Sequence, residues 1–321
     1  MPRRDTARAD GGFLSNAKVF SLQPGPRVEP GSVRGYYIDL RVKADEPRWP
    51  PSWVARGNGN VGVGQWGLAA YERYLAGEGD AWLDAARQTG EYLVEGQVGV
   101  GAQAGGWPYT VPFPHTFRLK PPWLSAMAQG QGASLLVRLY LETGDKRFAE
   151  AGLRALVPLT IESSRGGVAA QLDGRTFPEE YPTSPPSFVL NGGIFALWGL
   201  YDAAIGLGDS AAEKAFDEGV EVLAENIHRW DTGYWSRYDL YPHTVVNVAS
   251  SVYHLLHTNQ LRVLHRLRPT AALSEAADRF EAYASSRVNR WHAFAAKAMF
   301  RVLVPRNPTL ARRLPWSSLR R

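Results

Sequence analysis

Residues 128–156 read AQGQGASLLVRLYLETGDKRFAEAGLRAL, and this stretch decides the fold. Its apolar residues recur at helical spacing and mark one face: Leu135, Leu136, Leu139 and Tyr140. Gly144 then interrupts the pattern, and Asp145 supplies an N-cap signal for a second helix. The stretch therefore predicts two antiparallel helices joined by a short turn.

The same pattern occurs four times along the chain. The first helix of each pair begins near one of four positions: Gly64, Ala128, Asn191 and Val252. N-cap signals for the second helices stand at four more: Asp80, Asp145, Asp209 and Thr270. Repeated helical hairpins bury their faces against neighbours, either in an open solenoid or in an α/α toroid. We expect a mainly α protein, an incomplete (α/α) barrel of repeated hairpins.

Long segments connect one pair to the next, at about residues 98–125, 163–188 and 230–250. Loops longer than about 12 to 15 residues are uncommon in compact domains unless they serve a function. These segments carry many aromatic residues, and turns such as Asp173-Gly174 predict short β-hairpins. Because every hairpin enters and leaves in the same sense, the loops should gather at one end of the barrel. That end is the candidate active site, and aromatic side chains there suit sugar rings.

Composition and length limit the class of protein. The 321 residues are 45% hydrophobic, so the chain can bury a large core. We expect a lead-in segment over 1–50, the catalytic barrel over 51–300 and a basic tail over 301–321. The absence of cysteine excludes disulfides and thiolate metal sites. Residues 1–12 are polar and arginine-rich, which favours a cytoplasmic protein.

Charge is concentrated at the C-terminus. Residues 301–321 contain no acid and six arginines: Arg301, Arg306, Arg312, Arg313, Arg320 and Arg321. The remaining 30 basic residues, 36 less those six, almost balance 31 acids. This balance argues against a nucleic-acid partner. The tail is either solvated without a partner or weakly attracted to an anionic membrane surface.

Two motifs suggest cofactors, and their contexts speak against both. Residues 57–62, GNGNVG, match a dinucleotide fingerprint, but WPPSW at 49–53 replaces the buried strand that such a site requires. His254 and His257 are three residues apart on a predicted helix, with no carboxylate at ligand spacing beside them. We therefore expect no cofactor and no metal, and histidines that form hydrogen bonds in a polar pocket.

Acids and phenols on the loops are the candidate catalysts. Glu179 or Glu180, paired with Asp231 or Asp239, would suit a glycosidase, although such acids commonly serve as caps and ion-pair partners. Three tyrosines also belong to the loop end: Tyr181, Tyr238 and Tyr253. A phenol removes a carbon-bound proton only where cations or hydrogen bonds favour phenolate. Structural hydroxyls are the alternative interpretation.

Five ordered motifs resemble segments of the D-glucuronyl C5-epimerases. They are GGWP at 105–108, LSAMAQGQ at 124–131, EEYPTSPPSFVLNG at 179–192, YDL at 238–240 and YHLLHTNQL at 253–261. The resemblance covers about residues 100–285. It implies conversion of D-glucuronate to L-iduronate within an acidic, heparosan-like polysaccharide, without metal or redox cofactor.

The resemblance also assigns roles to residues. Glu180 and Tyr253 look like the two bases on opposite faces of C5, and Tyr181 and Tyr238 look like phenols that hold the carboxylate or assist proton transfer. We expect substrate-binding side chains at eight positions: Trp107, Gln131, Arg138, Asn191, Arg237, His254, His257 and Asn259. The sequence leaves the oligomeric state open and is compatible with a homodimer.

The chain departs from the family pattern in two places. Tyr241 stands where the family usually has an arginine, so Arg237, Arg118 or Lys120 would have to supply the charge. The large β-rich N-terminal part of animal members is missing from this sequence. Three alternatives stay open: an α/α-barrel polysaccharide lyase, a glycoside hydrolase and a noncatalytic glycan-binding module.

Overall fold

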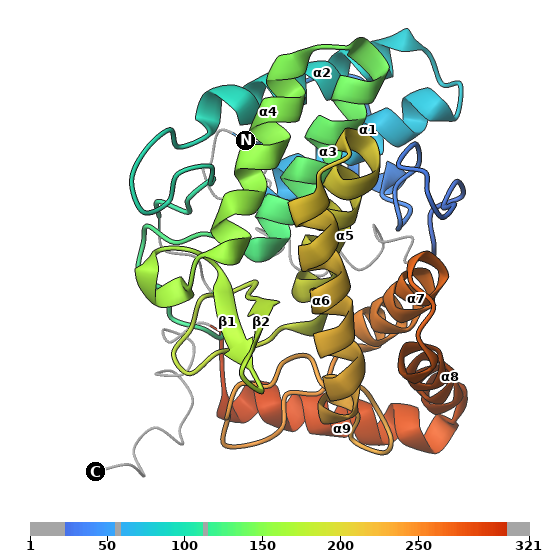
Figure 1. Cartoon of the computed structure of the whole chain (residues 1–321). Helices are drawn as coiled ribbons and strands as arrows, with labels where there is room; N and C mark the ends of the chain where they lie inside the picture. The colour runs from blue at the N-terminus through green and yellow to red at the C-terminus, as the bar shows by residue number, and fades with distance from the viewer. Residues whose placement is uncertain (1–22, 55–58, 112–114, 307–321) are drawn as a thin grey trace, which may run out of the picture.

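The computed structural model describes residues 23–54, 59–111 and 115–306 and is mainly helical. Eight of the described helices form four hairpins, which confirms the predicted repeat (Figure 1). The pairs are α1 Asn60–Leu75 with α2 Asp80–Gly96, α3 Ala126–Thr143 with α4 Lys146–Leu156, α5 Leu190–Leu207 with α6 Ser210–Asn226, and α7 Ser251–Leu267 with α8 Ala271–Ser285.

The first helices of the hairpins form an inner row in the order α1, α3, α5, α7, and each second helix packs outside its own partner. Residues 126–139 of α3 are all buried, whereas α4 buries one face only. Glycines allow the closest contact in this row. A Cβ on Gly199 of α5 would stand 2.6 Å from the Cα of Gly130 of α3. The row curves into the incomplete α/α barrel that the repeat predicts.

Side-chain caps fix the start of several helices. Asp145 accepts a hydrogen bond from the backbone N–H of Arg147, and Asp209 accepts one from Ala212, as predicted. Thr270 stands at the predicted N-cap position of α8, but its side chain forms no cap hydrogen bond. The prediction for Asp80 is wrong, because Asp80 is the first residue of α2 and Gly79 is the N-cap. Gly79 lies at a φ of 113°, so its backbone conformation sets that turn.

The N-terminal segment, in its described part, packs against the C-terminal ends of the inner helices. Arg27 pairs with Glu72 near the end of α1, and the Tyr37 hydroxyl donates to Asp202 near the end of α5. A short 3-10 helix, η2 Arg41–Lys43, lies beside α1. Since the long loops enter at the N-terminal ends of the inner helices, this segment fills the opposite end of the barrel.

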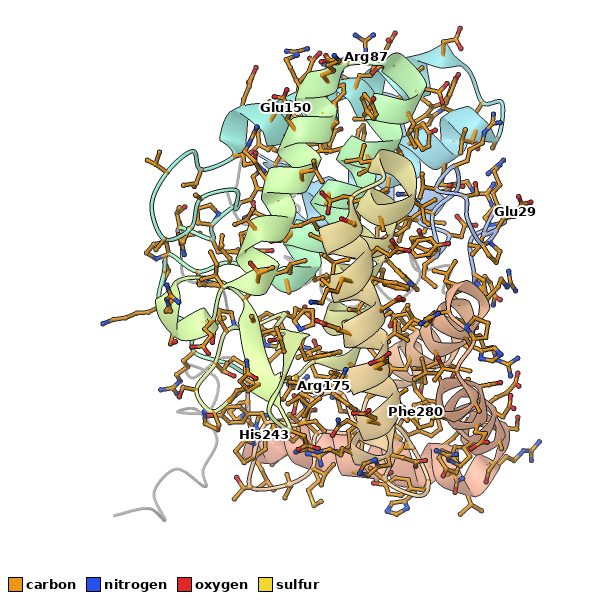
Figure 2. The ribbon with its side chains drawn as sticks, in the orientation of Figure 1. Glu29, Arg87, Glu150, Arg175, His243 and Phe280 are labelled. Carbon is orange, nitrogen blue, oxygen red and sulfur yellow. The ribbon has the colours of Figure 1, made fainter. Side chains whose placement is uncertain are left out.

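The long loops hold the remaining regular structure. The second loop contains the 3-10 helices η4 Val157–Thr160 and η5 Ser163–Arg165, then an antiparallel hairpin of β1 Ala169–Leu172 and β2 Arg175–Pro178. The third begins with η6 Ile227–Trp230. Figure 2 shows Arg175 and His243 at the same end of the molecule. The predicted β-hairpin therefore lies at the loop end.

A further helix, α9 Arg287–Leu303, has no counterpart in the predicted repeat. Ser286 caps it, and Ala293 and Phe300 are its buried residues. It packs on α8 and runs along one edge of the molecule (Figure 1). It crosses the expected boundary at residue 301, while residues 307–321 of the basic tail lie outside the described residues.

Helix α5 is long and apolar enough to cross a membrane by composition alone. In the described structure 78% of its apolar window is buried inside the protein, as befits the central helix of the inner row.

Arg138, which we expected to bind substrate, is fully buried near the filled end of the barrel. Its guanidinium donates to Asp202 at 2.7 Å and to the carbonyl oxygens of Ser134 and Gly35 at 2.8 Å. Arg138 lies in the second half of α3. Because a helix rises about 1.5 Å per residue, this position is well removed from the loop end, where α3 begins. The expectation was wrong, because this side chain joins α3, α5 and the N-terminal segment.

Arg138→Met is expected to lower the free energy of unfolding by about 3 to 5 kcal/mol, because Asp202 is left as an uncompensated buried charge. Denaturant unfolding followed by circular dichroism measures the loss. The control is Arg147→Met, which removes an ion pair to Asp145 whose arginine side chain is 65% exposed, and it should cost at most about 1 kcal/mol. Equal losses in the two variants would contradict the structural role of Arg138.

Candidate active site

Four predicted catalytic residues meet at the loop end of the barrel. Glu180 and Tyr181 follow β2, Tyr238 lies in the third loop, and Tyr253 stands in the first turn of α7. Burial is the largest cause of the raised pKa values of the three phenols, and the charge of Glu180 raises all three further, so the four side chains form one electrostatic cluster. The rings of Tyr238 and Tyr253 meet edge to face at 5.2 Å between centroids. We call these four residues the acid–phenol cluster.

The neighbouring Glu179 holds the second loop in place. Its two carboxylate oxygens accept hydrogen bonds of 2.7 Å, one from the backbone N–H of Phe188 and one from the hydroxyl of Ser187. Its backbone N–H donates to Val168, and its carbonyl accepts from Ala126 at the start of α3. Glu179 is therefore a structural anchor, and it positions the residue that follows it.

Glu180 is almost fully buried against the first turn of α5. A Cβ added to Gly192 would lie 2.3 Å from Glu180 Oε2, so glycine at this position makes room for the carboxyl group. Oε2 has no hydrogen-bond partner among the described residues. Burial raises the pKa of Glu180 to about 7, while the Tyr181 hydroxyl lowers it by a smaller amount. A carboxyl group with this pKa can accept and release a proton near neutral pH.

The phenols have pKa values above their usual range. Burial, followed by the charge of Glu180, raises the pKa values of Tyr181 and Tyr238 well above 10. The same causes raise the pKa of Tyr253 to about 12, and Arg306 and Arg301 oppose them. All three phenols are therefore protonated at neutral pH. They are able to donate protons and hydrogen bonds, and Glu180 is the member of the cluster that can take up a proton near neutral pH.

Helix α9 brings cations to the cluster that the sequence analysis missed. Lys297 Nζ donates to Asn247 Oδ1 and to the carbonyl of Val248, both at 2.7 Å, and lies 5.5 Å from the centroid of the Tyr238 ring. Burial lowers its pKa to about 7. Arg301 donates to Thr116 Oγ1, and burial lowers its pKa to about 10. The capping Ser286 and the spacing of Ala293 and Phe300 were the missed signals for this helix.

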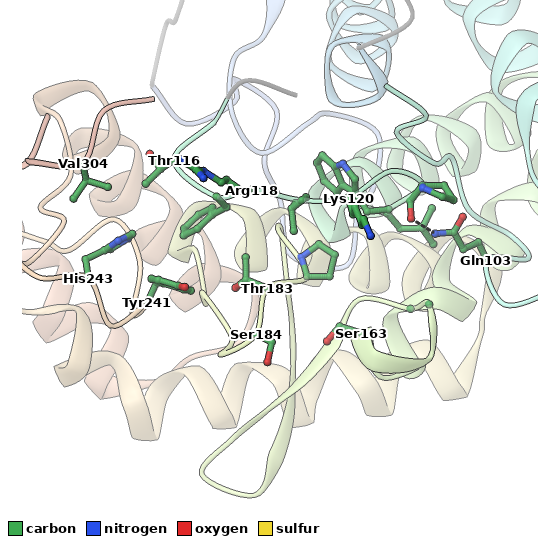
Figure 3. Close-up of a pocket in the computed structure, with 18 residues that line it drawn as sticks. Gln103, Thr116, Arg118, Lys120, Ser163, Thr183, Ser184, Tyr241, His243 and Val304 are labelled. Atoms are coloured by element: carbon green, nitrogen blue, oxygen red, sulfur yellow. Dashed lines mark hydrogen bonds between the residues drawn. The ribbon is translucent and has the colours of Figure 1, made fainter. Parts of the chain in front are cut away.

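A cleft of about 560 Å³ opens beside the cluster. Figure 3 shows Thr116, Tyr241 and His243 at one end of it and Gln103 at the other. Arg118 and Lys120 also line it, and both are exposed. The cleft is thus open to solvent and carries positive charge along one wall.

Two aromatic rings connect the wall of this cleft with the cluster. Phe117 and Trp123 line the cleft, and their centroids lie 5.3 Å and 5.8 Å from that of Tyr181. Both belong to a second hydrophobic core made largely of loop aromatics. The aromatic loops therefore bury most of their rings among themselves, and only part of this set forms the expected sugar-binding wall.

The two predicted histidines fasten the third loop to α7. The hydroxyl of Ser236 lies between them, 2.8 Å from His254 Nδ1 and 2.9 Å from His257 Nδ1. His254 Nε2 is 2.8 Å from the carbonyl of Phe280, and Trp235 stacks on the His254 ring. Burial lowers the pKa of His254 to about 4 and that of His257 well below its usual value. The expected hydrogen-bonding role is confirmed, and His254 uses both ring nitrogens within the protein.

Of the other expected binding residues, Trp107 belongs to the main hydrophobic core. Its indole N–H donates to the carbonyl of Leu93, and a Cβ on Gly132 would meet the ring at 2.4 Å. It is 5% exposed, which leaves no free ring face for a sugar. The expectation for Trp107 was therefore wrong.

Asn191 lies beside Gly192 in the first turn of α5, close to Glu180, and its carbonyl accepts from Gln260 of α7. Gln131 is fully buried in α3 against Gly64 of α1. Asn259 is nearly buried in α7. Among these three, Asn191 has the position nearest to the proposed base.

Other charged residues of the loops serve the fold. Asp231 pairs with Arg279 at 2.9 Å and accepts from the Tyr283 hydroxyl. Asp239 accepts from Asn247 Nδ2 and lies 3.3 Å from a ring nitrogen of His243. Arg237 is half-buried, its Nε has no hydrogen-bond partner among the described residues, and its substrate-binding role stays a prediction. These contacts hold the third loop together.

The glycine motif before α1 also has a structural explanation. A Cβ on Gly59 would lie 2.6 Å from the ring of Trp53, and one on Gly62 would lie 3.1 Å from it. Gly57 lies outside the described residues. The two described glycines allow an indole ring to pack against the start of α1.

Residues 101–282, more than half of the chain, match the family model of the D-glucuronyl C5-epimerase C-terminus. The chain belongs to this family. It is 36% identical over 201 residues to a D-glucuronyl C5-epimerase of Caenorhabditis elegans, which covers 56% of this chain and 32% of that protein. It therefore spans about a third of this relative's length.

Two other proteins are also similar. An uncharacterized protein of Methanocaldococcus jannaschii is 28% identical over 142 residues, which are 43% of this chain and 46% of that protein. Among solved structures, an unsaturated glucuronyl hydrolase from Bacillus sp. GL1 is similar with a TM-score of 0.46 and 14% identity, over 75% of this chain and 64% of that chain.

The departure of this family member at Tyr241 can now be placed. Tyr241 lines the cleft, and its ring packs against Phe117 and His243. Cations of α9 and of the segment after it act on the phenols: Arg306 and Arg301 both oppose the raised pKa of Tyr253, and Lys297 lies 5.5 Å from the centroid of the Tyr238 ring. Of the three replacements considered from the sequence, Arg118 and Lys120 lie on the cleft wall.

The raised pKa of Glu180 makes the stability of the protein depend on pH. The folded protein keeps a proton that the unfolded chain releases between the ordinary glutamate pKa of 4.5 and the folded value of about 7. The free energy of unfolding should therefore fall as pH rises through that window, by at most about 1.4 kcal/mol per pH unit from this group.

Glu180→Gln removes this titration. The free energy of unfolding of the variant, relative to that of the wild type, should therefore rise between about pH 5 and about pH 7 and stay constant above about pH 7. Thermal unfolding across this range measures it. Glu218→Gln, at a glutamate whose side chain is 57% exposed, is the control and should follow the wild type. A constant difference between Glu180→Gln and the wild type would contradict the raised pKa.

Proposed function

We propose that the protein inverts C5 of uronic acid residues, from D-glucuronate to L-iduronate, in an acidic, heparosan-like polysaccharide. The observation that carries this proposal is one base and one proton donor in the same buried cluster. Glu180 has a pKa of about 7 and a carboxylate oxygen without a described partner, and Tyr253 is a protonated phenol. Membership of the C5-epimerase family supports the same reaction.

The proposed reaction has two proton transfers. The Glu180 carboxylate removes the proton from C5, and the electron pair of the broken C–H bond moves into the substrate carboxylate to give an enediolate. The Tyr253 phenol then donates its proton to the opposite face of C5, which restores the C–H bond with inverted configuration. Glu180 releases its proton and Tyr253 regains one before the next turnover. Proton transfer by a positioned side chain contributes about 10²- to 10⁴-fold to a rate.

The enediolate carries extra negative charge on the carboxylate oxygens, so nearby donors must stabilise it. The phenols of Tyr181 and Tyr238 are protonated and supply hydrogen bonds. Lys297 uses two hydrogen bonds within the described protein, whereas an ammonium group has three donors. We assign Lys297 and Arg301 the charge that the family arginine supplies elsewhere.

A lyase would share the first step but would expel the substituent at C4 instead of reprotonating C5. A hydrolase would need a second available carboxylic acid beside Glu180. Glu179 and Asp231 are instead bound to groups that hold the loops. Asp239 accepts from Asn247 through Oδ2 and lies beside His243, outside the acid–phenol cluster. The cluster therefore favours epimerisation over hydrolysis.

The direct test is incubation of the protein with heparosan in deuterium oxide, followed by NMR of the product. The proposal predicts deuterium at C5 and iduronate signals in chains of unchanged length. Ultraviolet-absorbing unsaturated ends would show a lyase, and new reducing ends without unsaturation would show a hydrolase. If the protein produces no exchange at C5 and no cleavage, the proposal is contradicted for this substrate.

Glu180→Gln and Tyr253→Phe should each lower the rate of inversion by about 10²-fold or more, because each removes one of the two proton-transfer groups. Matched controls are Glu218→Gln, at an exposed carboxylate, and Tyr283→Phe, whose hydroxyl binds Asp231 outside the cluster. Iduronate formation by NMR is the measurement. Wild-type rates in either cluster variant would remove that residue from the mechanism.

The dependence of kcat/KM on pH should be bell-shaped around about pH 7, because Glu180 must be deprotonated and Lys297 protonated, each with a pKa of about 7. Lys297→Arg keeps the positive charge at higher pH. It should move the alkaline limb upward by about one pH unit or more and leave the acidic limb in place. An unchanged alkaline limb would exclude Lys297 as the titrating cation.

A further inference from the structure

Helix α9 presents an apolar face to solvent. Its large exposed hydrophobic residues are Val288 at 77%, Trp291 at 72%, Phe294 at 66%, Met299 at 53%, Val302 at 67% and Leu303 at 53% exposure. At about 100° per residue these positions share one side of the helix. Trp291 and Phe294 are the exposed tryptophan and phenylalanine of the described chain, and their rings contact each other. We call these six residues the outer face of α9.

The outer face does not hold α9 in the fold. Ala293 and Phe300 on the opposite side are its buried residues, and Lys297 bonds to the third loop from that side. Figure 1 shows α9 along one edge of the molecule, and α8 packs against it. Tyr234 of the third loop stacks on His292 at 3.9 Å between ring centroids, beside the outer face. The outer face is therefore available to a partner without unfolding the site.

The sequence from α9 to the C-terminus carries charge of a single sign. From residue 287 to residue 321 the sequence contains no Asp or Glu and nine basic residues: Arg287, Arg290, Lys297, Arg301, Arg306, Arg312, Arg313, Arg320 and Arg321. Arg287 and Arg290 are exposed beside the outer face. A basic segment next to exposed aromatic and aliphatic side chains is complementary to an anionic, partly apolar surface.

We propose that α9 docks the protein on an anionic phospholipid bilayer, with the helix parallel to the surface and its outer face between the headgroups. Trp291 and Phe294 enter the interface, where aromatic rings are favoured. Arg287 and Arg290 lie at its edge and reach the lipid phosphates, since long basic side chains bury their stems and keep their charges at the headgroups. The positive charge of the region adds an electrostatic attraction.

A second copy of the chain fits this face less well. A twofold interface would place the outer faces of two α9 helices together and so would bring their basic residues close to one another. The described α9 has no acidic residue to compensate them. Lipid phosphates supply the missing negative charge.

The chain has no cysteine, so one introduced cysteine can be labelled uniquely with a polarity-sensitive fluorophore. Phe294→Cys places the label on the outer face, and Lys214→Cys, at a 77% exposed side chain of α6, is the control. Vesicles of phosphatidylcholine mixed with phosphatidylglycerol should shift the emission of the label at position 294 to the blue and leave the label at position 214 unchanged. Equal responses at both positions, or none, would overturn the proposal.

Cosedimentation of the full chain with the same vesicles measures the affinity. The Trp291→Ser/Phe294→Ser variant should bind at least about tenfold more weakly, because two large apolar groups leave the interface. Val100→Ser, which alters an 84% exposed residue of the first loop, should bind like the wild type. Added salt and vesicles of phosphatidylcholine alone should both weaken binding.

Two further measurements distinguish a lipid bilayer from a second copy of the chain as the partner of the outer face. The double variant should retain wild-type epimerisation of a soluble oligosaccharide, since neither residue touches the cluster. Sedimentation velocity without vesicles should give the same mass for the wild type and the double variant. A wild-type dimer that the double variant abolishes would show that a second copy covers the outer face, and it would overturn membrane docking.

Discussion

The bond from Glu179 to the backbone N–H of Phe188 is the interaction on which the site depends. Phe188 has a φ of 44°, in the left-handed region that costs a non-glycine residue about 1 to 3 kcal/mol. Glu179 fixes the N–H of this residue, and the indole of Trp230 donates to its carbonyl. Both groups hold a strained turn that sends the chain from β2 into α5. The same turn places Glu180 against Gly192, where burial raises its pKa.

The adjacent glutamates thus have opposite functions although they are identical in sequence. Every carboxylate oxygen of Glu179 accepts a hydrogen bond from the loop, whereas Glu180 keeps Oε2 unpaired within the described protein. The carboxyl group of Glu179 is therefore occupied by hydrogen bonds within the loop, whereas that of Glu180 can still bind another group. Burial raises the pKa of both groups, to about 8 for Glu179 and to about 7 for Glu180, so it is the unpaired oxygen of Glu180 that distinguishes the two.

The sequence predicted the parts of the structure that depend on local patterns. Apolar spacing and turn residues predicted the hairpins, and the repeat predicted that the long loops gather at one end of the barrel. Motif order also gave the cluster of Glu180, Tyr181, Tyr238 and Tyr253. The roles of Arg138 and Trp107 could not be assigned in this way, because the residue type in a motif does not show whether the side chain points to a ligand or into the core. Their roles depend on Asp202 and Gly132, which only the packing of helices brings near.

The cations of helix α9 could not be placed near the cluster from the sequence either. The helix falls outside the repeat, so the cations on its inner side could not be connected with Tyr238, which lies far earlier in the chain. Its two sides now have separate proposed functions, since Lys297 and Arg301 face the cluster while Trp291 and Phe294 face solvent. Membrane docking through the outer face would bring the cleft close to the bilayer surface without changing the chemistry of the site.

The central claim is that Glu180 removes the C5 proton of glucuronate and that Tyr253 returns a proton to the other face. Isotope exchange by the Tyr253→Phe variant in deuterium oxide tests it most directly. Glu180 should still remove the proton and return a deuteron to the same face, so NMR should show glucuronate deuterated at C5 without iduronate. The opposite pattern, exchange in Glu180→Gln and none in Tyr253→Phe, would contradict the assignment of the two residues.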